Sequence, residues 1–156
     1  MDEQVVAFML GSEEYGIEIS RVREIIVYKG ATPMPKAPAY MDGIVDIRGM
    51  IIPVIDLGVK LGVATQQEEE KHALVVECGT QQVALRVDRV TEVRFIADEQ
   101  IDWTDKIEMP GSKGDRSIRG IGKIDSKLCI LLDVDRIFSA DEWTKLGETS
   151  AGSQAL

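Results

Sequence analysis

The sequence contains almost no histidine, and this scarcity limits the chemistry that the chain can perform. His72 is the only histidine among 156 residues, and it follows the charged run "EEEK" directly. A lone solvated histidine is far more often inert than catalytic, because a general base needs a nucleophile within reach and a group that orients it. No Ser/His/Asp set can be assembled around His72. The sequence therefore predicts that the protein is not an enzyme.

Cysteine is also scarce, which argues against a metal centre. Cys78 and Cys129 each lie within an apolar, strand-like run, with no second Cys or His at ligand spacing. We expect buried, reduced thiols, because free cysteine is among the most buried residue types. The segment "GSKGDRSIRG" has glycines and basic residues but lacks the order of a phosphate-binding loop. We therefore expect neither a metal nor a cofactor.

The sequence also has fewer basic than acidic residues, and the apolar run at its N-terminus is short. The chain has 18 Lys and Arg against 27 Asp and Glu, a net charge of -9. Nonspecific binding to nucleic acid needs the opposite sign, so nucleic acid is an unfavourable partner. The N-terminus, "MDEQVVAFMLG", is too acidic and its apolar run too short for a signal peptide or a membrane span. We expect a cytoplasmic protein without direct membrane insertion.

What the sequence does contain is strands. Apolar residues 5–10 and 15–19 flank the turn signal "GSEE", and residues 74–78 and 83–87 flank "GTQQ" in the same way. Apolar arms around a glycine and polar residues are typical of β-hairpins. The sequence therefore predicts an all-β fold.

A third hairpin is expected in "DIRGMIIPVIDL", residues 46–57. Gly49 can take the positive φ of a tight tip at no steric cost, which would hold Arg48 outward on a rigid base. Pro53 cannot donate a hydrogen bond to a neighbouring strand, so its arm should be an edge or a bulge. Edge strands are also where partner proteins dock. We interpret this hairpin as part of a surface that other proteins recognise.

The connections between these hairpins are polar or rich in proline. Residues 29–40 include three prolines within six residues, which predicts an extended connection. Residues 64–71 and 104–117 are charged or glycine-bearing segments without periodicity, typical of surface loops.

One helix start is convincing, at Ser139. Glu142 lies three residues later, which completes a capping box, with Trp143 and Leu146 as apolar contacts and Gly147 as a stop. Residues 148–156 should form a flexible tail.

The chain is also internally repeated. Residues 10–25 align with residues 78–93 without a gap, and residues 43–57 align with residues 120–134 in the same order. Each half would then hold a hairpin, a connection, a second hairpin and a short helical turn, about five strands in all. Small twisted sheets avoid exposed edges by closing, so the repeat predicts two barrels that share a seam. Within the repeat, Asp56 and Asp133 occupy equivalent positions and should cap the helical turns.

Three segments together resemble a known family. "EEYGIEISRVREI", "PKAPAYMDGIVDIRGMIIPVIDLGVKLG" and "VALRVDRVTEV" are similar to CheW, the chemotaxis coupling family, over residues 4 to about 146. One departure is Asp46-Ile47, where the family commonly has Asn-Leu. The resemblance implies one CheW-like domain over residues 1–147. Its subdomains would cover about 15–64 with part of the C-terminal region, and about 72–138, which could include the N-terminal strand.

The resemblance also implies a function. The family is a non-enzymatic adaptor of two SH3-like five-stranded barrels that couples chemoreceptor cytoplasmic tips to the regulatory domain of the histidine kinase CheA. The receptor tip, a helical hairpin, would lie in the groove between the barrels. Family receptor positions correspond to Ile19, Glu24, Arg48, Leu74, Val87, Val90 and Val93, and family kinase positions to Val22, Gly43, Ile44, Ile51 and Pro53. Arg48 would either contact the receptor or pair with Glu24 to shape the groove.

Other interpretations stay open. The same fold occurs as the coupling module of a protein fused to a receiver domain, and as an adaptor of a related pathway such as twitching motility. The short helix and tail at the end of the chain favour the standalone adaptor. A small barrel enzyme would need a convergent polar pocket, for which the sequence offers little.

Overall fold

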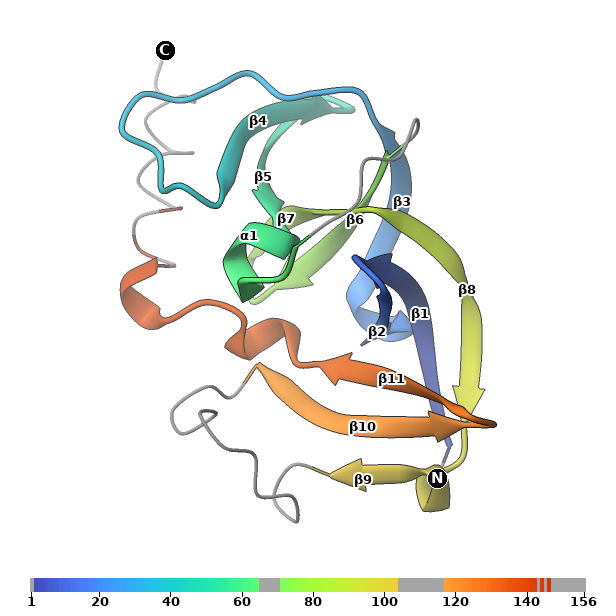
Figure 1. Ribbon diagram of the computed structural model, residues 1–156. Helices are drawn as coiled ribbons and strands as arrows, with labels where there is room; N and C mark the ends of the chain where they lie inside the picture. The colour runs from blue at the N-terminus through green and yellow to red at the C-terminus, as the bar shows by residue number, and fades with distance from the viewer. Residues whose placement is uncertain (1, 65–70, 104–116, 143, 145, 147–156) are drawn as a thin grey trace.

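The structure, a computed structural model, describes residues 2–64, 71–103, 117–142, 144 and 146 (Figure 1). Strands dominate it, as the sequence predicts, and they form two sheets. In sheet order, the six-stranded sheet contains β8 (Arg89–Ile96), β1 (Glu3–Leu10), β2 (Glu13–Glu18), β11 (Lys127–Leu132), β10 (Ile118–Ile124) and β9 (Ile101–Trp103). The five-stranded sheet contains β3 (Val22–Tyr28), β6 (Lys71–Cys78), β7 (Gln81–Val87), β5 (Met50–Asp56) and β4 (Met41–Ile47).

Short helical turns join or follow the strands: η1 (Ile19–Arg21), α1 (Leu57–Leu61), η2 (Asp98–Gln100) and η4 (Val134–Arg136). Figure 1 shows the five-stranded sheet in the upper half of the molecule and the six-stranded sheet in the lower half, both strongly curved. The fold is that of two SH3-like β-barrels, as expected. None of the helices in the described ranges is long and apolar enough to cross a membrane.

The three predicted hairpins are confirmed as the antiparallel pairs β1–β2, β6–β7 and β4–β5. The internal repeat is confirmed by the topology. The order β3-β6-β7-β5-β4 in one sheet corresponds, strand for strand, to β8-β1-β2-β11-β10 in the other. The bulges match too: Arg23 and Thr91 are extra residues at equivalent places, and so are Asp42 and Arg119. Both halves therefore share a backbone as well as a sequence pattern.

The two halves exchange their first hairpins. β1 and β2 belong to the sheet that the second half builds, whereas β6 and β7 belong to the sheet of the first half. The predicted subdomains therefore divide differently: residues 15–18 lie in the second sheet and residues 72–87 in the first. The N-terminal strand β1 pairs with β2 and β8 in the six-stranded sheet. Sequence order alone favours contiguous halves, because a crossover between barrels leaves no local signal.

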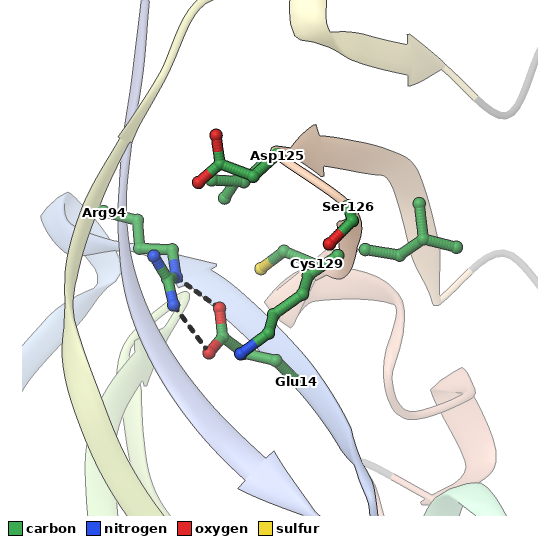
Figure 2. Close-up of a pocket in the computed structure, with 8 residues that line it drawn as sticks. Glu14, Arg94, Asp125, Ser126 and Cys129 are labelled. Carbon is green, nitrogen blue, oxygen red and sulfur yellow. Dashed lines mark hydrogen bonds and ion pairs between the residues drawn. The ribbon is translucent and has the colours of Figure 1, made fainter.

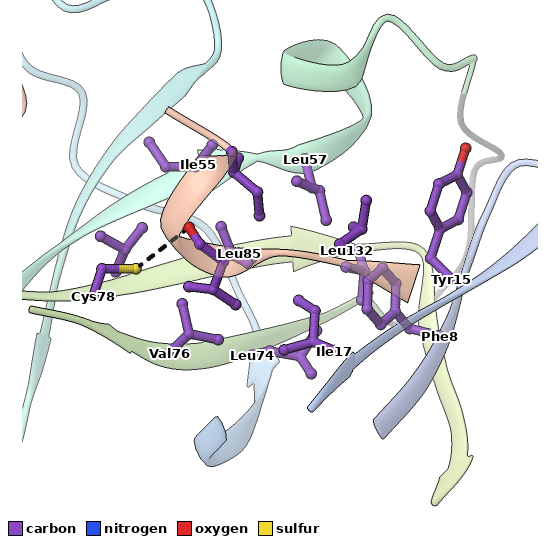
Figure 3. Close-up of a cluster of buried hydrophobic side chains, with 14 of the residues drawn as sticks. Phe8, Tyr15, Ile17, Ile55, Leu57, Leu74, Val76, Cys78, Leu85 and Leu132 are labelled. Carbon is purple, nitrogen blue, oxygen red and sulfur yellow. Dashed lines mark hydrogen bonds between the residues drawn. The ribbon is translucent and has the colours of Figure 1, made fainter. Parts of the chain in front are cut away.

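The exchanged hairpins build the central hydrophobic core. Phe8 and Ile17 from β1 and β2 pack in one cluster with Leu74 and Leu85 from β6 and β7 (Figure 3). All four are at most 1% exposed, and burying an aliphatic or aromatic side chain of this size contributes about 1.5 to 3 kcal/mol. Each sheet has in addition a smaller core of its own. The central cluster is thus the seam that holds the two barrels together.

The strand that carries Pro53 is neither an edge strand nor the bulged strand of its hairpin, so the prediction of an edge or a bulge is wrong: the bulge of the β4–β5 pair lies on β4, at Asp42. β5 lies between β4 and β7, and Pro53 is buried opposite Ile44 of β4. The backbone N–H and C=O of Ile44 bond to Thr32 on the other side, at 2.9 Å each. Alternate residues of an antiparallel pair point these groups away from the partner, so Pro53 removes no bond to β4. Pairing of β5 with β7 begins one residue later, at Val54.

The predicted helix caps are confirmed. Asp56 accepts a hydrogen bond from the Val59 N–H at 3.2 Å, and Asp133 accepts one from the Asp135 N–H at 3.0 Å. Each carboxylate satisfies a backbone donor that the first helical turn leaves unpaired.

The capping box at Ser139 is confirmed in both directions. Ser139 N–H donates to Glu142 Oε1 at 2.8 Å, and Glu142 N–H donates to Ser139 Oγ at 3.2 Å. Leu146 is fully buried, as its predicted apolar contact requires. Trp143, Gly147 and residues 148–156 lie outside the described residues, as do residues 65–70 and 104–116.

Candidate partner-binding surfaces

The tip of the β4–β5 hairpin presents Arg48 to solvent. Arg48 and Gly49 both have positive φ, 54° and 86°, the pattern of a two-residue hairpin turn whose twist matches the strands. The Gly49 N–H donates to Asp46 Oδ1 at 2.8 Å, which closes the turn. The Arg48 side chain is 81% exposed. The sequence predicted the glycine conformation and the outward arginine, but not the left-handed backbone of Arg48 itself.

Arg48 pairs with Glu24 across a groove. Arg48 Nη2 lies 3.1 Å from Glu24 Oε2, and this pair joins the hairpin tip to the edge strand β3. The groove has a volume of about 370 Å³ and is lined by Ser20, Val22, Arg23, Glu24, Ile47, Arg48, Met50 and Gln82. Exposed ion pairs contribute only about 0 to 1 kcal/mol to stability. The pair therefore contributes little to the stability of the fold, and its main effect is to orient the Arg48 and Glu24 side chains at the groove.

The outward faces of the edge strands β3 and β8 are apolar. Ile25 and Val27 of β3 are 44% and 45% exposed, and Val93 and Phe95 of β8 are 42% and 71% exposed. The two pairs occupy equivalent repeat positions, so each barrel carries the same feature. Sequence reasoning selected only Val93 of these four. The sequence of residues 22–28, VREIIVY, ends in a continuous apolar run, so it carried no signal that Ile25 and Val27 face solvent while the residue between them is partly buried.

Two further expected receptor positions, Ile19 and Val90, are partly exposed. Ile19, in η1 before β3, is 36% exposed, and Val90, at the start of β8, is partly buried. The Val90 N–H donates to His72 Nδ1 at 3.4 Å, and His72 lies opposite Val27 in the β3–β6 pair. These contacts bring the start of β8 close to the strand that pairs with β3. The predicted receptor set therefore draws on both barrels.

Three of the residues predicted to contact partners are buried. Leu74 and Val87 are 0% and 2% exposed in the central core, and Pro53 is buried opposite Ile44 of β4. Direct partner contact by these side chains does not fit the structure, because their faces pack against other core residues. Their role is to pack in the interior beneath the exposed residues.

The remaining kinase positions divide between two places. Gly43 and Ile44 lie on the edge strand β4, and Ile51 lies opposite Asp46 on β5. Ile44 and Ile51 are partly exposed, whereas Gly43 is buried with its backbone against Thr32. Val22 is elsewhere, in the groove with Glu24 and Arg48.

A second groove lies at the equivalent hairpin of the other barrel (Figure 2). Its volume is about 280 Å³, and its lining residues are Glu14, Arg94, Ile124, Asp125, Ser126, Lys127, Leu128 and Cys129. Arg94 forms two hydrogen bonds to Glu14 and an ion pair with Glu92 at 2.8 Å. Burial raises the pKa of the Cys129 thiol to about 12, so it stays protonated at neutral pH and is a poor nucleophile.

Cys78 behaves in the same way in the other barrel. It is free and buried, as is Cys129, which confirms the expectation of reduced internal thiols. Burial raises its pKa to about 12 as well. Among the described residues, no three His, Cys, Asp or Glu side chains are arranged to hold a metal ion.

Two barrels with exposed apolar edge strands, and an arginine presented at a rigid hairpin tip, define a protein of the scaffold or adaptor class. Comparison with known proteins identifies the family. The family model "CheW-like domain" matches residues 4–142. The chain belongs to the CheW-like family and is a chemotaxis adaptor.

Individual relatives agree with this assignment. The chain is 34% identical to a probable chemotaxis protein CheW of Rhizobium etli over 142 residues, 90% of each chain. It is 30% identical to the chemotaxis protein CheW of Thermotoga maritima, with 86% of each chain covered. The crystal structure of the scaffolding protein TtCheW from Thermoanaerobacter tengcongensis is similar with a TM-score of 0.79 at 30% identity, covering 91% of this chain and 96% of that one.

One relative is a longer protein. The chemotaxis protein CheV3 of Helicobacter pylori is 28% identical over 126 residues, but the match covers only 40% of that protein. The CheW relatives, by contrast, are covered over most of their length.

Proposed function

We propose that this protein couples the cytoplasmic tips of methyl-accepting chemoreceptors to the regulatory domain of the histidine kinase CheA, without catalysing a reaction itself. It would act in the cytoplasm and be recruited to receptor arrays at the membrane. The observation that carries the proposal is the exposed apolar face on each of the two edge strands, β3 and β8, together with the Arg48–Glu24 pair at the hairpin tip. Membership of the CheW-like family supports it.

The receptor-facing surface would consist of Ile19, Ile25 and Val27 with the Arg48–Glu24 pair on one barrel, and of Val90, Val93 and Phe95 on the other. A helical hairpin presents an apolar stripe flanked by polar residues. Exposed aliphatic and aromatic side chains match such a stripe, and a charged pair at the margin favours one orientation of the helix.

The kinase-facing surface would be the β4 edge with Ile44 and Ile51. Thr32 already bonds the Ile44 backbone, so a second barrel would pack against the two isoleucines, which are partly exposed, and would not pair with β4 at that point. This surface lies on the five-stranded sheet alone, whereas the receptor surface spans both sheets.

The proposal is tested by binding and by kinase control. We expect purified protein to bind a receptor cytoplasmic fragment and the CheA regulatory domain. Arg48→Ala should weaken receptor binding about tenfold, which corresponds to about 1.4 kcal/mol, and leave regulatory-domain binding unchanged. Calorimetric titration of both partners measures this, and phosphorylation assays in reconstituted arrays measure control of the kinase.

The matched control is Lys123→Ala. Lys123 forms an exposed ion pair with Asp102 at 2.8 Å, within the six-stranded sheet. This variant should behave as wild type with both partners. Wild-type protein that binds neither partner would contradict the proposed function, and an Arg48→Ala variant with wild-type receptor affinity would remove Arg48 from the surface.

A further inference from the structure

The chain crosses between the two sheets at η1, and a second segment leaves the six-stranded sheet beside it. β2 ends at Glu18 and continues through η1 into β3 of the other sheet. β11 is parallel to β2, with Ile130 opposite Tyr15, so β11 and β2 end on the same side. β11 continues into η4, which packs against β6 of the five-stranded sheet, where Cys78 Sγ lies 3.9 Å from the Val134 carbonyl oxygen. The parallel pair therefore brings η1 and η4 together at the seam.

Arg21 in η1 connects these segments through three hydrogen bonds. Its Nη1 donates to Asp135 Oδ2 at 2.9 Å, and its Nη2 donates to Asp135 Oδ1 at 2.6 Å. The same Nη2 donates to the backbone carbonyl of Glu77 on β6 at 2.8 Å. One planar guanidinium thus links the crossover, η4 after the six-stranded sheet, and a strand of the five-stranded sheet. A bidentate pair of this kind fixes direction as well as distance.

Both partners stay charged over the ordinary pH range. The hydrogen bond from Arg21 lowers the pKa of Asp135, and the same bond raises the pKa of Arg21. The Arg21 side chain is only 29% exposed, although Asp135 is 58% exposed.

The equivalent crossover in the other half has different residues. The repeat places Arg89 at the position of Arg21 and Gly58 at the position of Asp135, so the Arg21–Asp135 pair has no counterpart at the same repeat positions. The neighbouring Asp88 is 1% exposed, accepts a hydrogen bond from the Gly11 N–H at 2.8 Å, and lies 3.6 Å from Lys71 Nζ. The second crossover therefore has a buried carboxylate at a different position.

We infer that Arg21 is a positioning residue: with Asp135 and the Glu77 carbonyl it fixes the angle between the two barrels. The effect that this angle has on binding rests on the proposed function. The proposed receptor surface contains residues of both barrels, so receptor binding depends on the angle between them. The proposed kinase surface lies on one sheet, so kinase binding does not depend on that angle. Arg21 shares η1 with Ile19 of the proposed receptor surface, so a measurement of the barrel angle without any partner has to accompany the binding test.

The first test measures the angle without any partner. Exposed Lys29 follows β3, and exposed Asp98 lies in η2 next to the other sheet. Spin labels on Lys29→Cys and Asp98→Cys report the distance between barrels by pulsed electron paramagnetic resonance, while the buried native thiols react slowly. We expect Arg21→Ala to shift or broaden this distance distribution and Lys123→Ala to leave it unchanged. An unchanged distribution in folded Arg21→Ala would overturn the inference.

The second test measures the two partners separately. Arg21→Ala should bind a receptor fragment about five- to tenfold more weakly and bind the CheA regulatory domain as wild type does, a coupling of ordinary size. Arg21→Lys keeps the positive charge but loses the planar guanidinium. Its receptor affinity should therefore lie between that of the wild-type protein and that of Arg21→Ala. Equal loss of both partners would mean general destabilisation and would contradict a positioning role. If wild-type protein binds neither partner, the proposed function fails, and the distance measurement still decides the role of Arg21.

Discussion

Arg48 and Asp125 show how single residues diverge on a shared backbone. They are equivalent in the repeat, and both begin a hairpin turn with φ of 54° and 56°. A left-handed conformation costs an ordinary L-residue about 1 to 2 kcal/mol, less for Asp because its side chain can bond locally. Arg48 carries this cost without that compensation. Backbone strain of this kind is often retained at functional positions, which agrees with the role proposed for Arg48.

A second residue-scale consequence concerns Gly43 and its substitution by alanine. Gly43 has φ of 147°, and a Cβ there would lie 2.1 Å from the Thr32 backbone oxygen. Gly43→Ala must therefore move the backbone that covers the β4 edge. We expect a loss of about 3 kcal/mol in the free energy of unfolding, from strain and overpacking together. Urea denaturation measures it.

Gly49→Ala is the matched control for that variant. Gly49 also has positive φ, 86°, but a Cβ there would meet nothing within 4 Å. It should lose only about 1 kcal/mol. Equal losses in the free energy of unfolding for the two variants would show that the backbone at Thr32 shifts at little cost. Because Gly43 is so constrained, substitutions of Ile44 or Ile51 are better probes of the proposed kinase surface.

At the scale of elements, the C-terminal helix depends on its cap and on one cation. Its Glu142 also pairs with Lys60 at 3.0 Å, and the Lys60 ammonium lies 5.2 Å from the centre of the Tyr40 ring. Ser139→Ala removes the acceptor for the Glu142 N–H, so we expect a loss of about 1 kcal/mol and faster amide exchange in this helix. Thermal unfolding and hydrogen exchange measure both effects.

Ser12→Ala provides the comparison for the cap. Ser12 is an exposed serine in the turn between β1 and β2. It should change stability by less than about 0.5 kcal/mol, as surface substitutions usually do. A Ser139→Ala variant that matches Ser12→Ala in both measurements would mean that packing alone, through buried Leu146, holds the helix.

At the scale of the whole molecule, stability should decline in acid. The Arg21 hydrogen bond lowers the pKa of Asp135 below its ordinary value of 3.8. Partial burial alone would raise the pKa of Glu142, but the Ser139 N–H and the Lys60 ammonium lower it below 4.5. A carboxyl with a lowered folded-state pKa stabilises the fold above its unfolded-state pKa and loses that contribution as the pH falls through the folded-state value.

We therefore expect the melting temperature to be level above about pH 5 and to fall below about pH 4.5, measured by calorimetry between pH 7 and pH 3. Glu142→Gln should lower the plateau and reduce the slope, because it removes one of the two carboxyls whose lowered pKa is described above. A melting temperature that rises as the pH falls through this range would contradict the assignment of both carboxylates.

Much of the fold and part of the site could be predicted from local patterns. The hairpins, the caps at Asp56, Asp133 and Ser139, and the outward Arg48 all depend on residues close in sequence, and the structure confirms each. Leu74, Val87 and Pro53 were selected for surfaces but are buried. Ile25, Val27 and Phe95 were not selected but are exposed. Which face of a strand is covered depends on the sheet opposite, and local patterns do not identify that sheet.

The sequence by itself determined the strands, their turns and the duplication, because alternating side chains, turn glycines and capping carboxylates act within a few residues. Only the tertiary structure decided that the halves exchange hairpins, that β5 is an interior strand, and that Arg21 meets Asp135 and Glu77 across the seam. These outcomes join residues as many as 114 positions apart. Such contacts form only when distant strands find their pairing and bury a common core, and no short segment carries that information.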